Sequence, residues 1–214
     1  MQTATETRRA MTITYRSNKA LYVNLTNRCP CACTFCIRNN DLGVFGSDSL
    51  WLEREPTLEE VTASLDGQDL ASFDEVVFCG YGEPTERLEV LLAAAEHLKQ
   101  RDASLRIRVN TNGLSDLVNG KPTAALFAGK ADCISISLNT DDPAEYLSLC
   151  RPKFGAAAYP AMLQFAKEAA TSVPSVVMTV VGEPVTSLAR QERCRKIAES
   201  LGATLRVRPF EPGK

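Results

Sequence analysis

Short apolar or alternating runs recur along the chain, and amphipathic stretches of helical period separate them. The apolar runs lie at residues 20–26, 75–80, 105–111, 133–139, 175–181 and 204–210, which predicts six strands. The amphipathic stretches lie at residues 57–65, 86–100, 122–129, 156–170 and 187–202, which predicts five helices. Strands that alternate with helices form right-handed βαβ units and a parallel sheet. We therefore expect an α/β protein whose six units make an open, partial barrel.

Residues at the helix boundaries agree with this division. Thr57 and Glu60 match a capping box, and Gly202 follows the last helical stretch. Proline is tolerated in the first turn of a helix, where its missing N–H costs nothing, and the sequence offers Pro84, Pro122 and Pro160 in such places.

Composition limits the size and the class of the protein. The chain has 214 residues, 44% of them hydrophobic, which suits a single domain over 1–214 with an extension at 1–19 and a core at about 20–210. There are 24 Lys plus Arg against 26 Asp plus Glu, so no overall basic field favours nucleic acid. The first twenty residues lack a signal-peptide core, and no run approaches the roughly 18 apolar residues of a membrane span. We expect a cytoplasmic protein.

Four of the eight cysteines lie within CPCACTFC, which follows the first predicted strand. In a reducing cytosol such cysteines are metal ligands, catalytic thiols or small buried hydrophobes rather than disulfides. Cys29, Cys33 and Cys36 place three thiolates on one loop and leave a metal position open, which suits an iron-sulfur cluster or a catalytic zinc ion. Cys31 interrupts the set, and the spacing alone does not exclude it as a ligand.

Five segments together resemble the radical S-adenosylmethionine (radical SAM) superfamily. They are CxxxCxΦC with Phe35 at Φ, GYGEP (80–84), NTNG (110–113), SISLN (135–139) and RVRPF (206–210). More narrowly, TYRSNKALYVNLTNRCPCACTFCIRNN and YLSLCRPKFGAAAY resemble a small subgroup described as TatD-associated radical SAM proteins. The resemblance covers residues 20–210 and implies a radical SAM core, which is a partial (β/α)6 TIM-like barrel with parallel strands.

The resemblance implies two cofactors, a 4Fe-4S cluster on Cys29, Cys33 and Cys36 and S-adenosylmethionine on the open iron. Reductive cleavage in this family yields methionine and a 5'-deoxyadenosyl radical, which abstracts hydrogen from a substrate. An electron donor such as flavodoxin or ferredoxin, a functional link to a TatD-family hydrolase and a homodimer are the partners expected, without a membrane. The sequence does not identify the substrate or the reaction.

The resemblance also assigns residues to S-adenosylmethionine. Phe35 is expected near the adenine and Arg38 beside the negative cluster. Gly80 and Gly82 are expected to let the backbone turn close to the cofactor. Glu83, or the backbone beside it, is expected to receive the methionine ammonium. The whole cofactor-binding set is Phe35, Arg38, Gly80, Tyr81, Gly82, Glu83, Asn112, Ser137 and Asn139, the last two at positions that hydrogen-bond the ribose.

Alternation along the strands predicts a polar lumen. Arg106, Arg108 and Asn110 share one face of their strand, opposite apolar residues that must pack on the helices. Unpaired arginines in a lumen favour an anionic substrate. The alternative is that Arg108 and its neighbours pair with carboxylates such as Glu75, while the arginines of the last strand are exposed at the sheet edge. The hypothetical substrate-binding set is Asn24, Arg106, Arg108, Asn110, Arg206 and Arg208.

Other readings of the same residues stay open. Within enzymes, the alternatives are a role like that of glycyl-radical-enzyme activases or of 7-carboxy-7-deazaguanine synthase. A different class is a non-catalytic metal-binding interaction module. His97, the only histidine, is expected on a helix, either at the surface or partly buried. The scattered cysteines are interpreted as small buried hydrophobes: Cys79, Cys133, Cys150 and Cys194.

Overall fold

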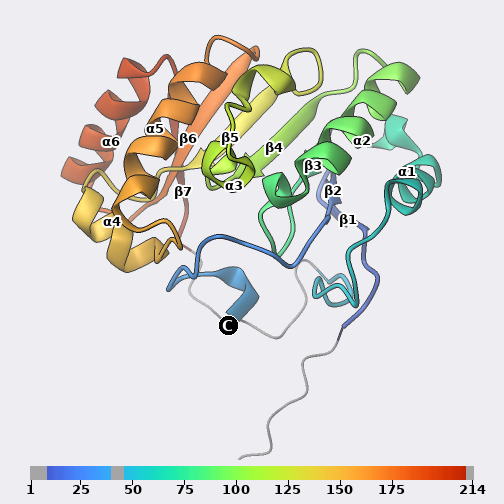
Figure 1. Ribbon diagram of the computed structural model, residues 1–214, viewed down its shortest axis with the longest axis horizontal. Coiled ribbons are helices and arrows are strands. Elements are labelled where there is room, and N and C mark those ends of the chain that lie inside the picture. The colour runs from blue at the N-terminus through green and yellow to red at the C-terminus, as the bar shows by residue number, and fades with distance from the viewer. Residues whose placement is uncertain (1–8, 40–45, 211–214) are drawn as a thin grey trace, which may run out of the picture.

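A seven-stranded sheet forms the centre of the protein in a computed structural model that describes residues 9–39 and 46–210. Helices cover one face of the sheet (Figure 1). The strand order is β1-β2-β3-β4-β5-β6-β7, with β1 antiparallel to β2 and every other pair parallel. Since strands adjacent in the sheet are also adjacent in sequence, the crossovers advance in one direction around an open, partial barrel. The α/β fold expected from the sequence is confirmed.

All six predicted strands are present, and most are shorter than the apolar runs. The strands are β1 (Thr14–Ser17), β2 (Ala20–Val23), β3 (Glu75–Phe78), β4 (Ile107–Thr111), β5 (Cys133–Ser137), β6 (Ser175–Val181) and β7 (Thr204–Arg208). The sequence did not predict β1. This strand lies within the N-terminal extension and pairs with β2 from Thr14↔Val23 to Ser17↔Ala20, which gives the sheet an antiparallel first edge.

Four of the five predicted helical stretches contain an α-helix, and two α-helices were missed. The α-helices are α1 (Leu58–Asp66), α2 (Leu88–Arg101), α3 (Ser115–Asn119), α4 (Pro143–Cys150), α5 (Ala158–Ala169) and α6 (Leu188–Ser200), and the 3-10 helices are η1 (Ile37–Asn39), η2 (Leu70–Ser72), η3 (Pro84–Arg87), η4 (Ala124–Phe127) and η5 (Gly155–Ala157). The stretch at 122–129 forms only η4, so Pro122 lies before its first turn. The sequence missed α3 and α4, which are five and eight residues long.

The predicted caps explain where two helices begin and end. Thr57 accepts from the backbone of Glu60, whose side chain in turn accepts from the Thr57 N–H, so the capping box at α1 is confirmed. Pro84 occupies the first position of η3, as expected. Gly202 has a φ of +77°, the left-handed conformation that favours glycine beyond a helix.

The hydrophobic core lies between the sheet and the helices. Alternate strand residues supply one side of it and helix residues the other. Fully buried members include Leu21, Val23, Phe78, Val109, Ile134 and Met178 from the strands, and Leu91, Leu98, Phe127 and Phe165 from the helical elements. A smaller cluster of Tyr15, Leu50 and Tyr81, with Tyr22 and Trp51, packs separately. The intervening strand residues face the concave side of the sheet, where no helix covers them (Figure 1).

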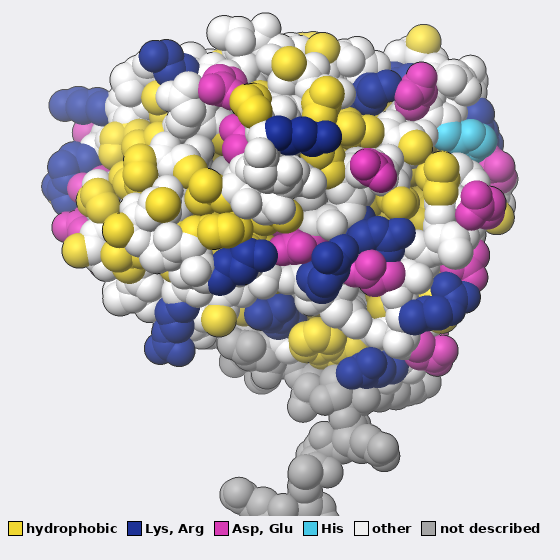
Figure 2. All heavy atoms as spheres, viewed as in Figure 1, with side chains coloured by type: hydrophobic (Ala, Val, Ile, Leu, Met, Phe, Trp, Pro, Cys, Tyr) yellow, Lys and Arg dark blue, Asp and Glu magenta, His cyan; other side chains and the backbone are white. Residues whose placement is uncertain are grey.

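The helical face carries charges of both signs. Figure 2 shows Lys and Arg interspersed with Asp and Glu over this face. His97 lies on α2 and its Nε2 is 2.7 Å from the Asp66 Oδ1, which places it at the surface as expected. Within residues 9–39 and 46–210, every helix is too short or too polar to cross a membrane.

Candidate functional site

The cysteine loop runs from residue 24 to η1 and leaves the carboxyl end of β2, below the sheet in Figure 1. Cys29, Cys33 and Cys36 are partly exposed, whereas Cys31 is buried in the core with 4% of its surface exposed. The carboxyl ends of parallel strands are where α/β folds bind their ligands. The three predicted ligands therefore lie at the functional end of the sheet, together with the more deeply buried Cys31.

Backbone hydrogen bonds fix the shape of the cysteine loop against the end of α4. They run from Ala32 N to Cys150 O (3.1 Å), from Thr34 N to Leu149 O (2.9 Å) and from Lys153 N to Pro30 O (2.8 Å). Cys31 and Pro152 form an isolated antiparallel bridge between the same segments. The backbone of the cysteine loop thus hydrogen-bonds to a segment that follows it by more than a hundred residues in the sequence.

Cys150 was interpreted as a scattered buried hydrophobe, and it is buried, but its thiol also contacts the cysteine loop. Hydrogen bonds between thiols lower the pKa of Cys29, which has Cys31 as partner, and of Cys33, which has Cys150 and Cys31 as partners. The same contacts raise the pKa of Cys31 and of Cys150. This arrangement favours thiolates at Cys29 and Cys33. The contact between Cys33 and Cys150 spans 117 positions, so no local spacing could reveal it.

The surroundings of these thiols suit an anionic cluster. Arg38 donates from Nη2 to the carbonyl oxygen of Cys31 at 3.2 Å, and its charge also lowers the pKa of Cys33. A hollow of about 360 Å³ beside Cys33 is lined by Arg38 and Arg151, with Ala32 and Thr34. Two guanidiniums next to a thiolate site can offset the negative charge of an iron-sulfur cluster with thiolate ligands.

A single metal ion would need a different arrangement of ligands. Within the described residues, no three His, Cys, Asp or Glu side chains are placed as ligands of one ion. A tetrahedral zinc ion holds thiolates about 3.8 Å apart, given Zn–S bonds of about 2.3 Å. A 4Fe-4S cluster instead takes one thiolate on each of three irons. Cys29, Cys33 and Cys36 are all thiol donors, the ligand type that such a cluster takes.

Glu83 connects the GYGEP segment to the NTNG segment. The residue is 4% exposed, and its carboxylate accepts four hydrogen bonds, from Thr85 N (3.2 Å), Thr85 Oγ1 (2.8 Å), Thr111 Oγ1 (2.7 Å) and Asn112 N (2.8 Å). Burial raises the pKa of Glu83, and these donors partly oppose the shift. Because the carboxylate is occupied by the protein, the backbone beside Glu83 is the better candidate for the methionine ammonium.

We expect Glu83→Gln to lower the stability of the protein. The new amide places a donor where the carboxylate accepted, so at least one buried donor of Thr111 or Asn112 loses its partner. The cost is about 2–4 kcal/mol, which corresponds to a fall in Tm of about 5–15 °C for a chain of this size. Thermal unfolding followed by circular dichroism measures it. The matched control is Glu89→Gln, an exposed position on α2. Equal Tm values for the two variants would contradict this structural role.

The glycines of GYGEP make room for the protein itself. A Cβ on Gly80 would lie 2.0 Å from Asn24 Oδ1, and a Cβ on Gly82 would lie 2.2 Å from Thr26 O and 2.6 Å from Arg28 O. The backbone N–H of Glu83 also donates to Arg28 O at 2.8 Å. The close approach expected from the sequence is therefore present, but its partner is the cysteine loop rather than an open cofactor surface.

Three further residues from the predicted cofactor set lie around the cysteine loop. Asn112 Nδ2 is 3.9 Å from Cys29 Sγ, and Asn139 Nδ2 donates to Cys150 Sγ at 3.2 Å. Ser137 ends β5 two residues before Asn139. Asn139 has a φ of +65°, and its buried Oδ1 has no partner within the described part of the chain. A buried acceptor without a donor fits a site for a hydroxyl group, such as those of a ribose.

Residues 23–194 match the Radical SAM superfamily, which is most of the chain. The chain belongs to this superfamily. Radical SAM enzymes use a 4Fe-4S cluster and S-adenosylmethionine. No curated protein sequence matches the chain.

Solved structures with a similar fold are radical SAM enzymes of longer chain. A radical SAM methyltransferase from Sphaerobacter thermophilus is 17% identical, with a TM-score of 0.63 over 92% of this chain and 57% of its own. Streptococcus suis SuiB bound to the precursor peptide SuiA is 17% identical, with a TM-score of 0.67 over 90% of this chain and 39% of its own. Methylornithine synthase (PylB) is 15% identical, with a TM-score of 0.57 over 90% of this chain and 53% of its own. At these identities the likeness shows the radical SAM fold alone.

Two aromatic residues from the predicted radical SAM set differ in exposure. Phe35 lies on the outer side of the cysteine loop with 45% of its surface exposed. Tyr81 is 4% exposed and packs edge-on against Trp51, with ring centroids 5.3 Å apart. Phe35 is therefore accessible to a ligand, whereas Tyr81 serves the aromatic cluster beneath GYGEP.

The predicted substrate set divides into buried, paired and unpaired residues. Asn24 is fully buried and donates from Nδ2 to Leu50 O at 2.8 Å, so it is unsuited to contact a substrate. Arg108 forms a bidentate ion pair with Glu75, from Nη2 to Oε1 (2.6 Å) and from Nε to Oε2 (3.2 Å). Its Nη1 also donates to Asn110 Oδ1 at 3.2 Å. The alternative of pairing with Glu75 therefore describes Arg108.

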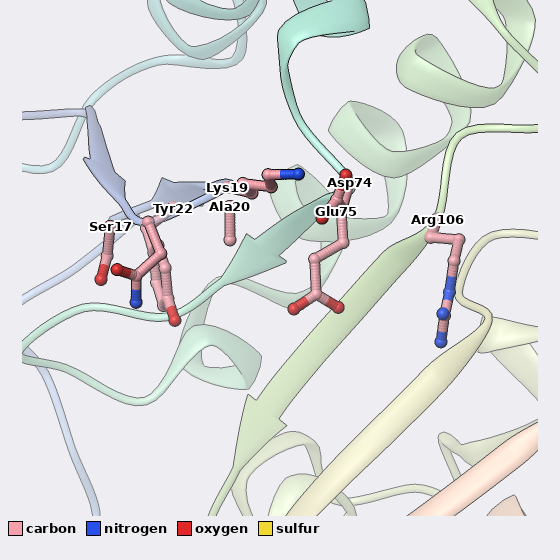
Figure 3. Close-up of a pocket in the computed structure, with 8 residues that line it drawn as sticks. Ser17, Lys19, Ala20, Tyr22, Asp74, Glu75 and Arg106 are labelled. Atoms are coloured by element: carbon pink, nitrogen blue, oxygen red, sulfur yellow. The ribbon is translucent and has the colours of Figure 1, made fainter.

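Arg106 lies at the opposite end of the sheet from the cysteine loop. It precedes β4 and lines a depression of about 350 Å³ with Tyr22, Asp74 and Glu75 at the amino ends of the strands. Figure 3 shows Glu75 and Arg106 projecting to the same side of the sheet. This depression contains charges of both signs and lies away from the radical SAM cofactor residues.

Proposed function

We propose that this protein cleaves S-adenosylmethionine reductively and uses the 5'-deoxyadenosyl radical to abstract hydrogen from a substrate. The observation that carries the proposal is the meeting of three segments distant in sequence. GYGEP and NTNG join through the Glu83 carboxylate, and the cysteine loop lies against both through Arg28 O and Cys29 Sγ. A cluster bound here supplies one electron to the sulfonium of S-adenosylmethionine.

In this proposal the residues of the chain bind and orient the cofactors. Cys29, Cys33 and Cys36 hold the cluster, and Arg38 offsets its charge while it also fixes the loop through the carbonyl of Cys31. Cys150 is buried, and its side chain contacts the Cys33 thiol from the core side. These contacts exclude water from one side of the thiolates, which strengthens the electrostatic interactions there.

The cofactor residues of the later strands complete the proposed site. Ser137 and Asn139 receive the ribose, and the unpartnered Oδ1 of Asn139 accepts one of its hydroxyls. The backbone next to Glu83 receives the ammonium, because the Glu83 carboxylate already accepts four hydrogen bonds from the protein. Phe35 lies exposed beside the thiolates and can cover the adenine.

Anaerobic reconstitution with iron and sulfide tests the proposed function. We expect a brown protein with a broad absorbance near ~400 nm and about four irons per chain. With dithionite and S-adenosylmethionine, we expect 5'-deoxyadenosine and methionine in equal amounts, measured by liquid chromatography. A colourless, zinc-loaded protein without cleavage would instead identify the metal-binding module considered above.

The substrate and the partners are not fixed by the fold, because similar folds support a methyltransferase, a peptide-bound enzyme and methylornithine synthase. We propose flavodoxin or ferredoxin as the electron donor and the TatD-associated subgroup as the closer relatives. The two segments that resemble this subgroup support the proposal, because residues 149–153 hydrogen-bond to the cysteine loop. Co-purification with a TatD-like hydrolase from the source organism tests the functional link.

A further inference from the structure

The concave face of the sheet carries an excess of positive charge. Strand alternation points Arg108, Arg206 and Arg208 toward this face, away from the core residues between them. Glu75 is the only carboxylate that the described strands direct to it, and Arg108 binds both of its oxygens. The Arg108 side chain is 12% exposed, so its charge is neutralised and largely covered. Among the described residues, the two positive charges on β7 have no counterion.

Arg206 and Arg208 have no carboxylate partner within residues 9–39 and 46–210. Both are exposed, and they stand two residues apart on one face of β7, about 6.6 Å at ~3.3 Å per residue. The one polar contact of Arg206 runs from Nη2 to Ser135 Oγ at 3.5 Å, which directs the guanidinium over the sheet rather than off its edge. Desolvation, and then the charge of Arg206, lower the pKa of Arg208. The two guanidiniums therefore repel each other in the present structure.

The register of the sheet places this pair beside the proposed cofactor site. Arg206 aligns with Thr179, which aligns with Ser137 at the end of β5. Arg208 aligns with Val181, which lies two residues nearer the carboxyl end of the sheet than Thr179. The charge of Arg208 also acts on the Cys79 thiol, which lies directly before GYGEP across the concave face. Arg206 and Arg208 thus lie two strands from the predicted ribose contacts at the end of β5, and the charge of Arg208 reaches the thiol that precedes GYGEP.

We propose that Arg206 and Arg208 of β7, with Ser135 of β5, form the binding site for a carboxylate or phosphate group of the substrate. This inference rests on the proposed function and deepens it by naming the substrate class. A guanidinium binds either anion through two parallel N–H groups, and an anion between the two side chains removes their repulsion. Of the four arginines in the substrate-binding set predicted from the sequence, this site keeps Arg206 and Arg208 and leaves out Arg106 and the ion-paired Arg108.

Calorimetric titration of the purified full chain with inorganic phosphate and, separately, with succinate tests the site at low ionic strength. The test variant is Arg206→Gln/Arg208→Gln. The matched control is Arg195→Gln/Lys196→Gln, which removes the same charge from two exposed positions on α6. We expect at least one anion to bind the wild type and the control alike, and the test variant to bind it at least about tenfold more weakly. The tighter of the two anions identifies a phosphoryl or a carboxylate substrate.

Three results would overturn the anion site. They are wild-type binding weaker than about 10 mM for both anions, equal loss of affinity in the test and control variants, and displacement of the anion by saturating S-adenosylmethionine. The last would assign the arginines to the cofactor. The titrations need neither a cluster nor turnover, so their failure leaves cleavage of S-adenosylmethionine standing. Conversely, absence of cleavage in the wild type would refute the proposed function while the titrations still report on the site.

Discussion

Single replacement of Cys29, Cys33 or Cys36 by alanine is expected to abolish both the 4Fe-4S signal and cleavage of S-adenosylmethionine. Two thiolates cannot hold the cluster stably, so iron should fall from about four per chain to near zero after reconstitution and desalting. Iron analysis and the ~400 nm absorbance measure the cluster, and 5'-deoxyadenosine measures the reaction. The loss should be complete for each position rather than graded.

Cys31→Ala is the matched control, because Cys31 lies in the same loop but is buried and is not among the three predicted ligands. We expect it to keep its cluster and its activity and to lose only about 1 kcal/mol of stability from the small cavity. Bleaching of the protein by Cys31→Ala, together with retention of iron by Cys29→Ala, would reverse the assignment of ligands.

Gly82→Ala should cost both stability and iron. The new Cβ would lie 2.2 Å from Thr26 O and 2.6 Å from Arg28 O, and backbone atoms cannot yield as a flexible side chain does. The cysteine loop must shift, so Cys29 moves with it. Overpacking of this kind costs about 1–3 kcal/mol, a fall in Tm of about 2–12 °C, and we expect iron occupancy to drop by half or more.

Gly67→Ala provides the comparison for this variant. Gly67 caps α1 with a φ of −73°, and a Cβ there would lie 3.6 Å from Ala63 O and 3.8 Å from Ser64 O, both ordinary contacts. Its Tm and iron content should match those of the wild type. If Gly82→Ala also keeps the Tm and the iron content of the wild type, the tight packing between GYGEP and the cysteine loop is needed neither for stability nor for iron binding.

Local patterns were sufficient for the strands and the long helices. The parallel strands alternate or are apolar and the long helices carry caps, so side-chain period and boundary residues identify both. β1 was missed because its four residues, TYRS, are mostly polar and become a strand only by pairing with β2. α4 was missed because it is eight residues long, although Asp142 caps it and Pro143 begins it. Those two residues were the available signal.

Sequence motifs located the candidate site but could not reveal how its parts are held. The spacing of Cys29, Cys33 and Cys36 and the position of GYGEP were visible in the sequence. The four hydrogen bonds of Glu83 and the contact between Cys33 and Cys150 were not, since they join separate βα units. Alternation placed Arg108 on the concave face correctly, but periodicity carries no information about which carboxylate it meets.

The dependence of the cysteine loop on residues 149–153 sets an order of assembly. A chain made from its N-terminus exposes Cys29, Cys33 and Cys36 long before α4 has been synthesised. Until then the loop lacks the carbonyl oxygens of Leu149 and Cys150, and its thiols have no fixed spacing. Contacts of such long sequence separation form late and slowly. Insertion of iron must therefore follow translation through α4, and a nascent chain stalled earlier would offer metal only a mobile set of thiols.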